Sequence, residues 1–338
     1  MTELNTYLVI GSGSIAKRHI ANLKQLFGPA RVGCVSASGR ALLAEEVGED
    51  TQRFASLQDA LQVRPCFVIV ASPAPWHIEH AAVLLQQRIP VLIEKPVADS
   101  LERLSGVHDL LMEHASIIDV AYNLRYMTSA TAFKALLDER CVGDVRGVSV
   151  DVGQYLPDWR PASDYRNNVS ARQALGGGVL LELSHELDYL GWLFGEFDTV
   201  YCAARNSGAL EIDVEDTVDA VLVRKDGLVA NVHMDFLQRA PVRTCKVIGQ
   251  LGTLVWDILN NRIVLHTGKD QQRVLFDDPS YDRNNMYLDQ LRHFAQVAQG
   301  VVRPAVGIVD ALRTLQLIEA MRRSAVVGQV ISIGGIQA

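Results

Sequence analysis

Short apolar runs alternate with helical patterns through the first third of the chain. The runs predict strands at Tyr7–Ile10, Arg31–Val35, a stretch ending at Phe54, Phe67–Val70, Val91–Ile93 and Ile117–Val120. Apolar residues at helical spacing between them predict helices at Ser14–Phe27, Ala41–Val47, Leu57–Leu61, Ile78–Gln87 and Leu101–Met112. Unbroken β-branched runs are typical of strands buried on both faces. The alternation therefore predicts βαβ units and a doubly wound parallel sheet.

The pattern changes after about Tyr122. Longer, partly alternating runs follow, and one hairpin is well marked because Asp226-Gly227 suits the tight turn between Thr217–Val223 and Leu228–Phe236. Predicted helices in this part are Val179–Phe194, Tyr287–Ala298 and Ile308–Ala325. We therefore expect an α/β domain over residues 1–121 and an α+β domain with a mostly antiparallel sheet over residues 122–338.

Composition and charge exclude several classes of partner and site. The 338 residues are 49% hydrophobic and 21% charged, which fits a globular protein with more than one core. The net charge of −7 and the scattered Lys and Arg residues argue against a nucleic-acid partner. The five cysteines show no C-x-x-C spacing, so we expect no zinc site and no disulfide framework. No run approaches the ~18 apolar residues of a membrane span and no signal pattern precedes the first strand, so we expect a cytoplasmic protein without membrane contact.

A glycine motif joins the first strand to the first helix. It reads Gly11-Ser12-Gly13-Ser14-Ile15-Ala16. The first glycine permits the tight turn, the second lets a pyrophosphate approach the backbone, and Ala16 keeps the helix close to the strand. The phosphates would lie on the positive end of the helix. In this context the motif predicts a Rossmann domain that binds NAD(P) through Gly11 to Ile15, the alternative being a glycine-rich turn without a ligand.

The end of the second strand bears on which cofactor is bound. A domain for NAD usually carries Asp or Glu there to bind the ribose 2′-hydroxyl. Here Ser36 and Arg40 occupy the stretch, and no acidic residue precedes Glu45. An arginine suits a 2′-phosphate, which favours NADP over NAD. The alternative is that Arg40 only begins a solvated helix.

Several spaced motifs together resemble one family. They are Ala71-Ser72-Pro73 with His77 following, Glu94-Lys95-Pro96, Ala121-Tyr122-Asn123-Leu124-Arg125-Tyr126, Gly176-Gly177-Gly178 before a helix bearing His185 and Asp188, and a closing helix with Ser324-Ala325. In this order they resemble the Gfo/Idh/MocA oxidoreductases over nearly the whole chain. The resemblance implies a homodimer or homotetramer formed through the C-terminal sheet.

The resemblance also implies roles for individual residues. The lysine matching Lys95 contacts the reacting hydroxyl beside the nicotinamide, and the histidine matching His185 acts as general acid/base. Both roles suit the chemistry, because an imidazole can accept a hydroxyl proton near neutral pH and an ammonium group stabilises a developing alkoxide. Further cofactor contacts are expected from Ser72, Pro73, His77, Glu94 and Asn123. Substrate contacts are expected from Asn123, Arg125 and Asp188.

One position departs from the family pattern. Relatives often carry an Asp four residues before the histidine, where this chain has Leu181, and Glu182 stands three residues before His185. Because steps of three keep helical side chains adjacent, Glu182, His185 and Asp188 are expected near one helix face. Glu182 either replaces the missing carboxylate in catalysis or only shapes the helix. The E-x-x-H pair could also form half of a metal site, but no second such pair follows, and we expect no metal.

An irregular loop precedes this helix. Its aromatic and arginine side chains predict a wall of the substrate site, because aromatic faces stack on sugars and arginine forks bind phosphate or carboxylate. The residues concerned are Tyr155, Trp159, Arg160, Tyr165 and Arg166. The alternative is a solvated loop with a few packed aromatic residues.

The expected activity is hydride transfer between NAD(P) and a secondary carbinol or carbonyl of a sugar, an amino sugar or a nucleotide-linked sugar. Two alternatives stay open: a reductase of a non-sugar carbonyl or an unsaturated compound, and a non-catalytic NAD(P)-binding regulator of the same fold.

Overall fold

The computed structural model describes residues 5–28 and 30–334. The described residues form two compact units, one within Met1–Asn123 and Asn284–Leu312 and the other within Leu124–Arg283 and Arg313–Ala338. This division differs from a single cut after residue 121, because the segment from Asn284 returns to the first unit. Each unit is described by itself below.

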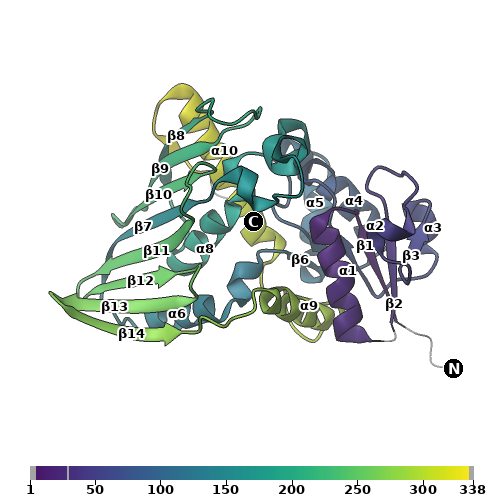
Figure 1. The fold of residues 1–338 in the computed structure, drawn as a ribbon, viewed down its shortest axis with the longest axis horizontal. Helices are drawn as coiled ribbons and strands as arrows, with labels where there is room; N and C mark the ends of the chain where they lie inside the picture. Colours follow the sequence, from purple (N-terminus) through teal and green to yellow (C-terminus); the bar gives the residue numbers. More distant parts are fainter. Residues whose placement is uncertain (1–4, 29, 335–338) are drawn as a thin grey trace. The chain divides into compact units, whose positions relative to one another are not determined.

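The first unit contains a six-stranded parallel sheet (Figure 1). Its strands are β1 (Thr6–Ile10), β2 (Arg31–Val35), β3 (Gln52–Phe54), β4 (Phe67–Val70), β5 (Val91–Ile93) and β6 (Ile118–Val120). They lie in the order β3-β2-β1-β4-β5-β6. This is the Rossmann order, in which the winding reverses between β1 and β4, and folds of this order bind ligands at the carboxyl ends of the strands. The predicted fold class is confirmed.

Helices cover this sheet. They are α1 (Ser14–Phe27), α2 (Ala44–Val47), α3 (Leu57–Leu61), α4 (His77–Leu85), α5 (His108–Glu113) and α9 (Asn284–Ala298). The helix predicted at Leu101–Met112 is wrong in one respect: a 3-10 turn, η2 (Leu101–Leu104), and α5 replace it. Gly106, with φ +78°, lies between them and breaks the helix. The predicted start of α2 at Ala41 is also wrong, because α2 begins at Ala44.

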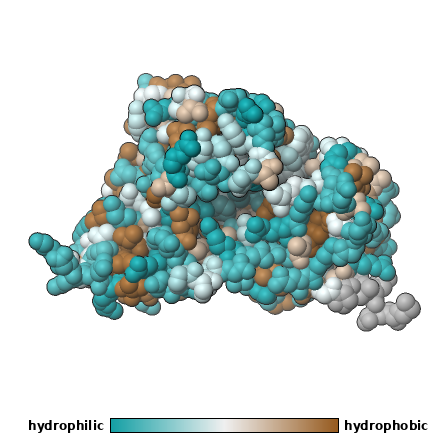
Figure 2. All heavy atoms as spheres, viewed as in Figure 1, coloured by the Kyte–Doolittle hydropathy of each residue, from teal (hydrophilic) through white to brown (hydrophobic). Residues whose placement is uncertain are grey.

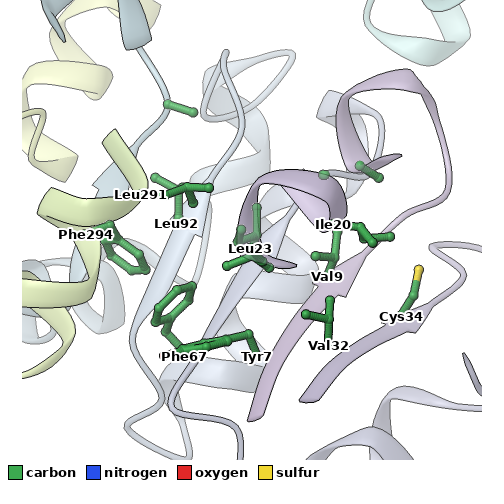
Figure 3. Close-up of a cluster of buried hydrophobic side chains, with 14 of the residues drawn as sticks. Tyr7, Val9, Ile20, Leu23, Val32, Cys34, Phe67, Leu92, Leu291 and Phe294 are labelled. Atoms are coloured by element: carbon green, nitrogen blue, oxygen red, sulfur yellow. The ribbon is translucent and has the colours of Figure 1, made fainter. Parts of the chain in front are cut away.

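The core of the first unit explains why α9 belongs to it. Buried apolar side chains of β1, β2, β4, α1 and α9 belong to one hydrophobic cluster, in which Phe294 of α9 lies near Phe67 of β4 (Figure 3). The rings of Phe67 and Phe294 pack edge to face, with centroids 5.1 Å apart. Asn22 of α1 and Asn284 of α9 exchange two side-chain hydrogen bonds of 3.2 and 2.9 Å. The segment from Asn284 thus completes a hydrophobic core that the first 123 residues leave open.

The second unit is built on a nine-stranded sheet in the order β14-β13-β12-β11-β7-β10-β9-β8-β15. Its strands are β7 (Val145–Gly153), β8 (Thr199–Arg205), β9 (Thr217–Val223), β10 (Val229–Asp235), β11 (Val242–Gly249), β12 (Thr253–Asp257), β13 (Arg262–Gly268), β14 (Gln271–Asp277) and β15 (Ile331–Ser332). Among the strands of the described residues in this sheet, only β7 and β10 pair in parallel, which confirms the mostly antiparallel sheet. The predicted hairpin is confirmed as β9–β10, with Val223 opposite Val229.

Buried aromatic side chains join helices to this sheet. Trp256 of β12 is fully buried, stacks on Phe133 of α6 (Thr128–Asp138) and meets the ring of Tyr189. Its indole N–H donates to Ser129 Oγ at 2.8 Å, so its one polar atom is satisfied. A hydrogen bond joins a further helix to the sheet near its β15 edge: Ser324 Oγ of α10 (Ile308–Val327) accepts the Cys202 N–H of β8 at 2.9 Å.

The helix predicted at Val179–Phe194 is interrupted. It forms α7 (Val179–Glu182) and α8 (Ser184–Phe194), with Leu183 at φ −96°, ψ 23° between them. The prediction of one continuous helix is therefore wrong. Glu182 ends α7 while His185 is the second residue of α8, so helical spacing alone does not relate these two side chains.

Among the described residues, no helix combines the length and hydropathy needed to cross a membrane. On the face drawn in Figure 2, hydrophobic residues form small groups among hydrophilic ones.

Candidate cofactor and catalytic residues

The turn after β1 has the geometry of a phosphate cradle. Gly11 has φ +120°, and a Cβ there would lie 2.4 Å from the Ala71 carbonyl oxygen. Only glycine fits a backbone that approaches the end of β4 so closely. A Cβ on Gly13, in contrast, would meet nothing within 4 Å, so space lies open above this residue.

The first turn of α1 can receive an anion. Gly13 caps the helix without a side-chain hydrogen bond, and no acidic residue occupies the first turn. The first amide groups of a helix lack internal partners and carry its positive end. Ala16 is fully buried, as close packing of α1 on the sheet requires. These observations fit a dinucleotide whose pyrophosphate rests on Gly13 and Ser14.

The end of β2 brings Arg40 to the glycine turn. Its guanidinium donates to Ser12 Oγ at 3.2 Å, and Ser36 lies nearby in sequence, buried, with its hydroxyl 3.2 Å from that of Ser38. Arg40 also forms a two-point ion pair with Glu46, at 2.9 and 2.5 Å. This pairing, reinforced by the Leu43 N–H, lowers the pKa of Glu46 to about 2. The arginine expected to meet a 2′-phosphate therefore already holds a carboxylate.

Two histidines of α4 contact the turn that follows β4. His77 is buried, and its Nδ1 and Nε2 lie 2.8 Å from the Pro96 carbonyl oxygen and 2.6 Å from the Ser72 carbonyl oxygen. Burial lowers the pKa of His77 despite these bonds. Ser72 Oγ lies 3.1 Å from His80 Nδ1, and burial also lowers the pKa of His80. The His77 ring thus links the turn that contains Ser72 and Pro73 to the turn that contains Lys95.

Glu94 and Lys95 follow β5 directly. Glu94 is 7% exposed, and its Oε1 lies 2.7 Å from Nε2 of the fully buried His19. The Lys95 N–H donates to Glu94 Oε2 at 3.2 Å, and the Lys95 side chain is half-buried. Asn123, 4% exposed, lies beyond the neighbouring strand β6. The predicted residues of the first unit therefore occur at successive carboxyl ends of β1, β2, β4, β5 and β6.

In the second unit, two predicted substrate residues bind each other. Arg125 Nε and Nη2 donate to the two carboxylate oxygens of Asp188, at 2.9 and 2.7 Å. Their side chains are only 9% and 2% exposed. The Arg125 guanidinium also lies 5.6 Å from the ring centre of Trp192. This geometry is that of a buried two-point ion pair.

The short helix α7, which precedes the helix that carries His185, contacts a carboxylate outside the motifs of the sequence analysis. Glu215 Oε1 accepts the Leu180 N–H of α7 at 3.0 Å. Burial raises the pKa of Glu215. A Cβ on Gly178, which has φ +103°, would lie 2.5 Å from that oxygen, so this glycine is required for the close approach. Glu182 and His185 are both half-buried.

The loop predicted to contact substrate forms several 3-10 turns, beginning with η5 (Leu156–Trp159) and η6 (Tyr165–Asn167). Trp159 packs edge to face on Phe236, and its indole N–H donates to the Gln154 carbonyl oxygen. The Arg239 guanidinium lies 3.5 Å from the ring centre of Tyr155.

Charged partners surround one arginine of this loop. Arg166 pairs with Asp164 at 2.8 Å and Glu211 at 3.0 Å, whereas Arg160 is exposed. Tyr165 is half-buried. Within residues 5–28 and 30–334, no group of three or more His, Cys, Asp or Glu side chains is arranged to hold a metal ion.

Comparisons with known proteins identify relatives in sequence and solved structures of similar fold. Inositol 2-dehydrogenase 2 of Saccharopolyspora erythraea is 28% identical over 236 residues, 67% of this chain and 65% of that protein. The matched regions of the first three such relatives span from 31% to 65% of their lengths. Two solved structures share the fold. The WlbA dehydrogenase from Bordetella pertussis, in complex with NADH and UDP-GlcNAcA, has a TM-score of 0.80, 22% identity and coverage of 98% of this chain and 99% of that one. Levoglucosan dehydrogenase, in complex with NADH and levoglucosan, has a TM-score of 0.82, 19% identity and coverage of 99% and 100%.

Two family models match consecutive parts of the sequence. The model of the oxidoreductase family with an NAD-binding Rossmann fold matches residues 5–122. The model of the GFO/IDH/MocA C-terminal domain matches residues 131–255. Together they cover more than half of the chain, in the order in which the two folds occur. This protein belongs to the Gfo/Idh/MocA family of oxidoreductases.

Proposed function

We propose that the protein transfers hydride between NAD(P) and a secondary carbinol or carbonyl of a sugar, an amino sugar or a nucleotide-linked sugar. The observation that carries this proposal is the cradle of the first unit: a helix start without a side-chain cap, open space above Gly13, and Lys95 at the end of β5. A bound nicotinamide supplies the hydride acceptor or donor. The similarity to an inositol dehydrogenase and a levoglucosan dehydrogenase supports a sugar-type substrate.

Residues of the first unit would hold the cofactor. The amide groups of Gly13, Ser14 and Ile15 would bind the pyrophosphate, and Ser12 and Ser36 would border the adenosine ribose. Contacts further along the dinucleotide are proposed for Ser72, Pro73 and Asn123. His77 would act mainly through the two turns that its ring connects.

The Arg40–Glu46 pair bears on cofactor preference. A 2′-phosphate bound at Arg40 would either displace the Glu46 carboxylate or be repelled by its negative charge. Ribose hydroxyls, in contrast, can donate hydrogen bonds to a carboxylate. Because this carboxylate is fixed at Arg40, we now favour NAD over NADP, against the expectation from Arg40 alone.

Lys95 and His185 are the proposed catalytic residues. The Lys95 ammonium would orient the substrate oxygen and stabilise its developing negative charge. The His185 imidazole would accept the hydroxyl proton during oxidation and return it during reduction. His185→Asn should then lower turnover and remove the low-pH limb of kcat/KM, because protonated imidazole cannot accept a proton. An unchanged limb at an undiminished rate would assign the base role to another residue.

Substrate contacts are proposed for Tyr155, Trp159, Arg160 and Tyr165. Arg166 is less available, because Asp164 and Glu211 already neutralise it. Asp188 and Arg125 would act as a unit, since each satisfies the other. Glu182 remains a candidate partner for the histidine, and Glu215 joins it because its carboxylate lies at the start of α7.

Assembly through the nine-stranded sheet is also proposed, as a homodimer or homotetramer. Tyr201 of β8 and Val221 of β9 are paired neighbours, and their side chains are 45% and 37% exposed. Analytical ultracentrifugation of the wild type and Val221→Lys tests this. A wild-type monomer would contradict it.

The proposed activity is tested by anaerobic fluorescence titration with NADH and NADPH, followed by a panel of polyols, sugars and nucleotide-linked sugars with both cofactors. We expect cofactor binding and turnover on at least one class, read at the nicotinamide absorbance. Binding without turnover on any class would favour a non-catalytic regulator, and absence of binding would refute the proposal.

A further inference from the structure

A buried histidine contacts the Lys95 turn, the residues Glu94 and Lys95 that follow β5. His19 lies on α1, about one and a half turns after Ser14, and is fully buried. The ring of Tyr287 packs edge to face on it at 6.3 Å, and the Arg18 guanidinium lies 4.7 Å from the ring centre of Tyr287. These contacts hold the imidazole in one orientation, with Nε2 directed at Glu94 Oε1.

The hydrogen bonds assign the proton in this pair. No described residue hydrogen-bonds His19 Nδ1, which is buried. An N–H at that atom would be a buried donor without an acceptor, which costs more than an unused lone pair. We therefore assign a ring proton to Nε2, which donates to Glu94 Oε1. The other Glu94 oxygen accepts the Lys95 N–H, so both oxygens of this carboxylate act as acceptors.

We propose that His19 is a positioning residue for Lys95: it fixes the Glu94 carboxylate, and the carboxylate fixes the main chain of the Lys95 turn. The same helix offers its first turn to the cofactor phosphates, so α1 connects the phosphate cradle to the lysine. The proposal rests on the proposed function for the role of Lys95, but the contacts that define it are present without any ligand.

The test compares two substitutions of His19. Gln carries its amide nitrogen as many bonds from the backbone as histidine carries Nε2, whereas Asn matches Nδ1. His19→Gln can therefore keep the donor to Glu94, and His19→Asn cannot. Asn22→Ala is the matched control, because Asn22 is buried on the same helix and its lost hydrogen bonds lead to Asn284 instead of the Lys95 turn.

Two readouts separate positioning from packing. The first is hydrogen exchange of the Lys95 amide without cofactor, followed by mass spectrometry of fragments that resolve this residue. The second is the division of any kinetic loss between kcat and KM, together with the cofactor Kd. We expect His19→Asn to speed amide exchange and to lower kcat, each by about tenfold or more, with the cofactor Kd within about threefold of wild type.

His19→Gln should restore most of both readouts. Asn22→Ala should lower the melting temperature while leaving the exchange of the Lys95 amide and kcat near wild type. Equal behaviour of His19→Asn and Asn22→Ala would overturn the proposal, as would equal losses in His19→Gln and His19→Asn. If His19→Asn does not fold, a loss in soluble His19→Gln equal to that of Glu94→Gln overturns it, and a smaller loss supports it. If the wild type turns over no substrate, amide exchange still decides, so this proposal and the proposed function fail separately.

Discussion

The buried pair of Arg125 and Asp188 allows a quantitative prediction. Asp188→Ala removes a carboxylate that accepts two hydrogen bonds, at 2.9 and 2.7 Å, from a guanidinium whose side chain is 9% exposed. Water reaches the arginine poorly, so its charge would lose its neutralising carboxylate without gaining full hydration. Breaking a buried ion pair in this way costs about 3–5 kcal/mol. For a unit of this size, that is a fall in melting temperature of roughly 6–20 °C.

The assay is urea unfolding followed by tryptophan fluorescence, with thermal unfolding as a second measure. The double substitution Arg125→Met/Asp188→Leu is the informative companion, because well-packed apolar residues often replace a buried ion pair at little cost. We expect it to be more stable than Asp188→Ala. A loss below about 1 kcal/mol in Asp188→Ala would refute the reasoning, since the pair would then contribute like an exposed one. A raised substrate KM with unchanged stability would show instead that Asp188 serves substrate binding.

Three further predictions follow from single side chains. Lys95→Ala should lower turnover by at least about 100-fold while the cofactor Kd stays within several-fold, in single-turnover kinetics and fluorescence titration; near-normal turnover would contradict its role. Glu46→Gln should shift preference toward NADPH by roughly threefold or more, measured as the ratio of the two Kd values, whereas an unchanged ratio would show that Glu46 does not compete for Arg40. Burial disfavours the charged His233 ring, but its bonds to Asp219 and Asp235 outweigh this and raise its pKa. The stabilisation is then complete below the ordinary histidine pKa and lost as pH rises through the raised value, so His233→Asn should destabilise more at pH 6 than at pH 9; equal losses at both would contradict it.

Local patterns predicted much of the fold. The bounds of α1, β2, β4, β5 and β9 agree with the sequence prediction, because unbroken apolar runs and helical spacing are local properties. The return of α9 to the first unit depends on contacts such as Phe294 with Phe67, which no local pattern reveals. The break at Leu183 is not evident from the sequence for a similar reason: the helical pattern continues through it, while Glu215 from a distant segment binds the start of α7.

In the candidate site, too, local motifs predict some residues, and only long-range contacts reveal the others. Motif position identified Gly11, Lys95 and the family, because glycine requirements and strand ends can be read along the chain. It could not identify partners. Arg40 was interpreted without Glu46, and Arg125 and Asp188 were interpreted without each other, although each pair is joined by two hydrogen bonds.

His19 and Glu215 lie outside the motifs that identify the family. Their contacts join distant segments: 75 residues separate His19 from Glu94, and 35 separate Leu180 from Glu215. The sequence signal that indicates His19 is its position on the otherwise apolar face of the predicted helix, where a polar residue needs a hydrogen-bond partner.

The central claim is hydride transfer from a secondary carbinol to the nicotinamide, and isotope transfer tests it most directly. A sugar alcohol selected from the panel is deuterated at the reacting carbon and incubated with the protein and oxidised cofactor, and the reduced cofactor is analysed by mass spectrometry. The reduced cofactor should carry the deuterium, and Lys95→Ala should form it far more slowly. Reduced cofactor without deuterium, or turnover of the substrate without reduced cofactor, would contradict the account.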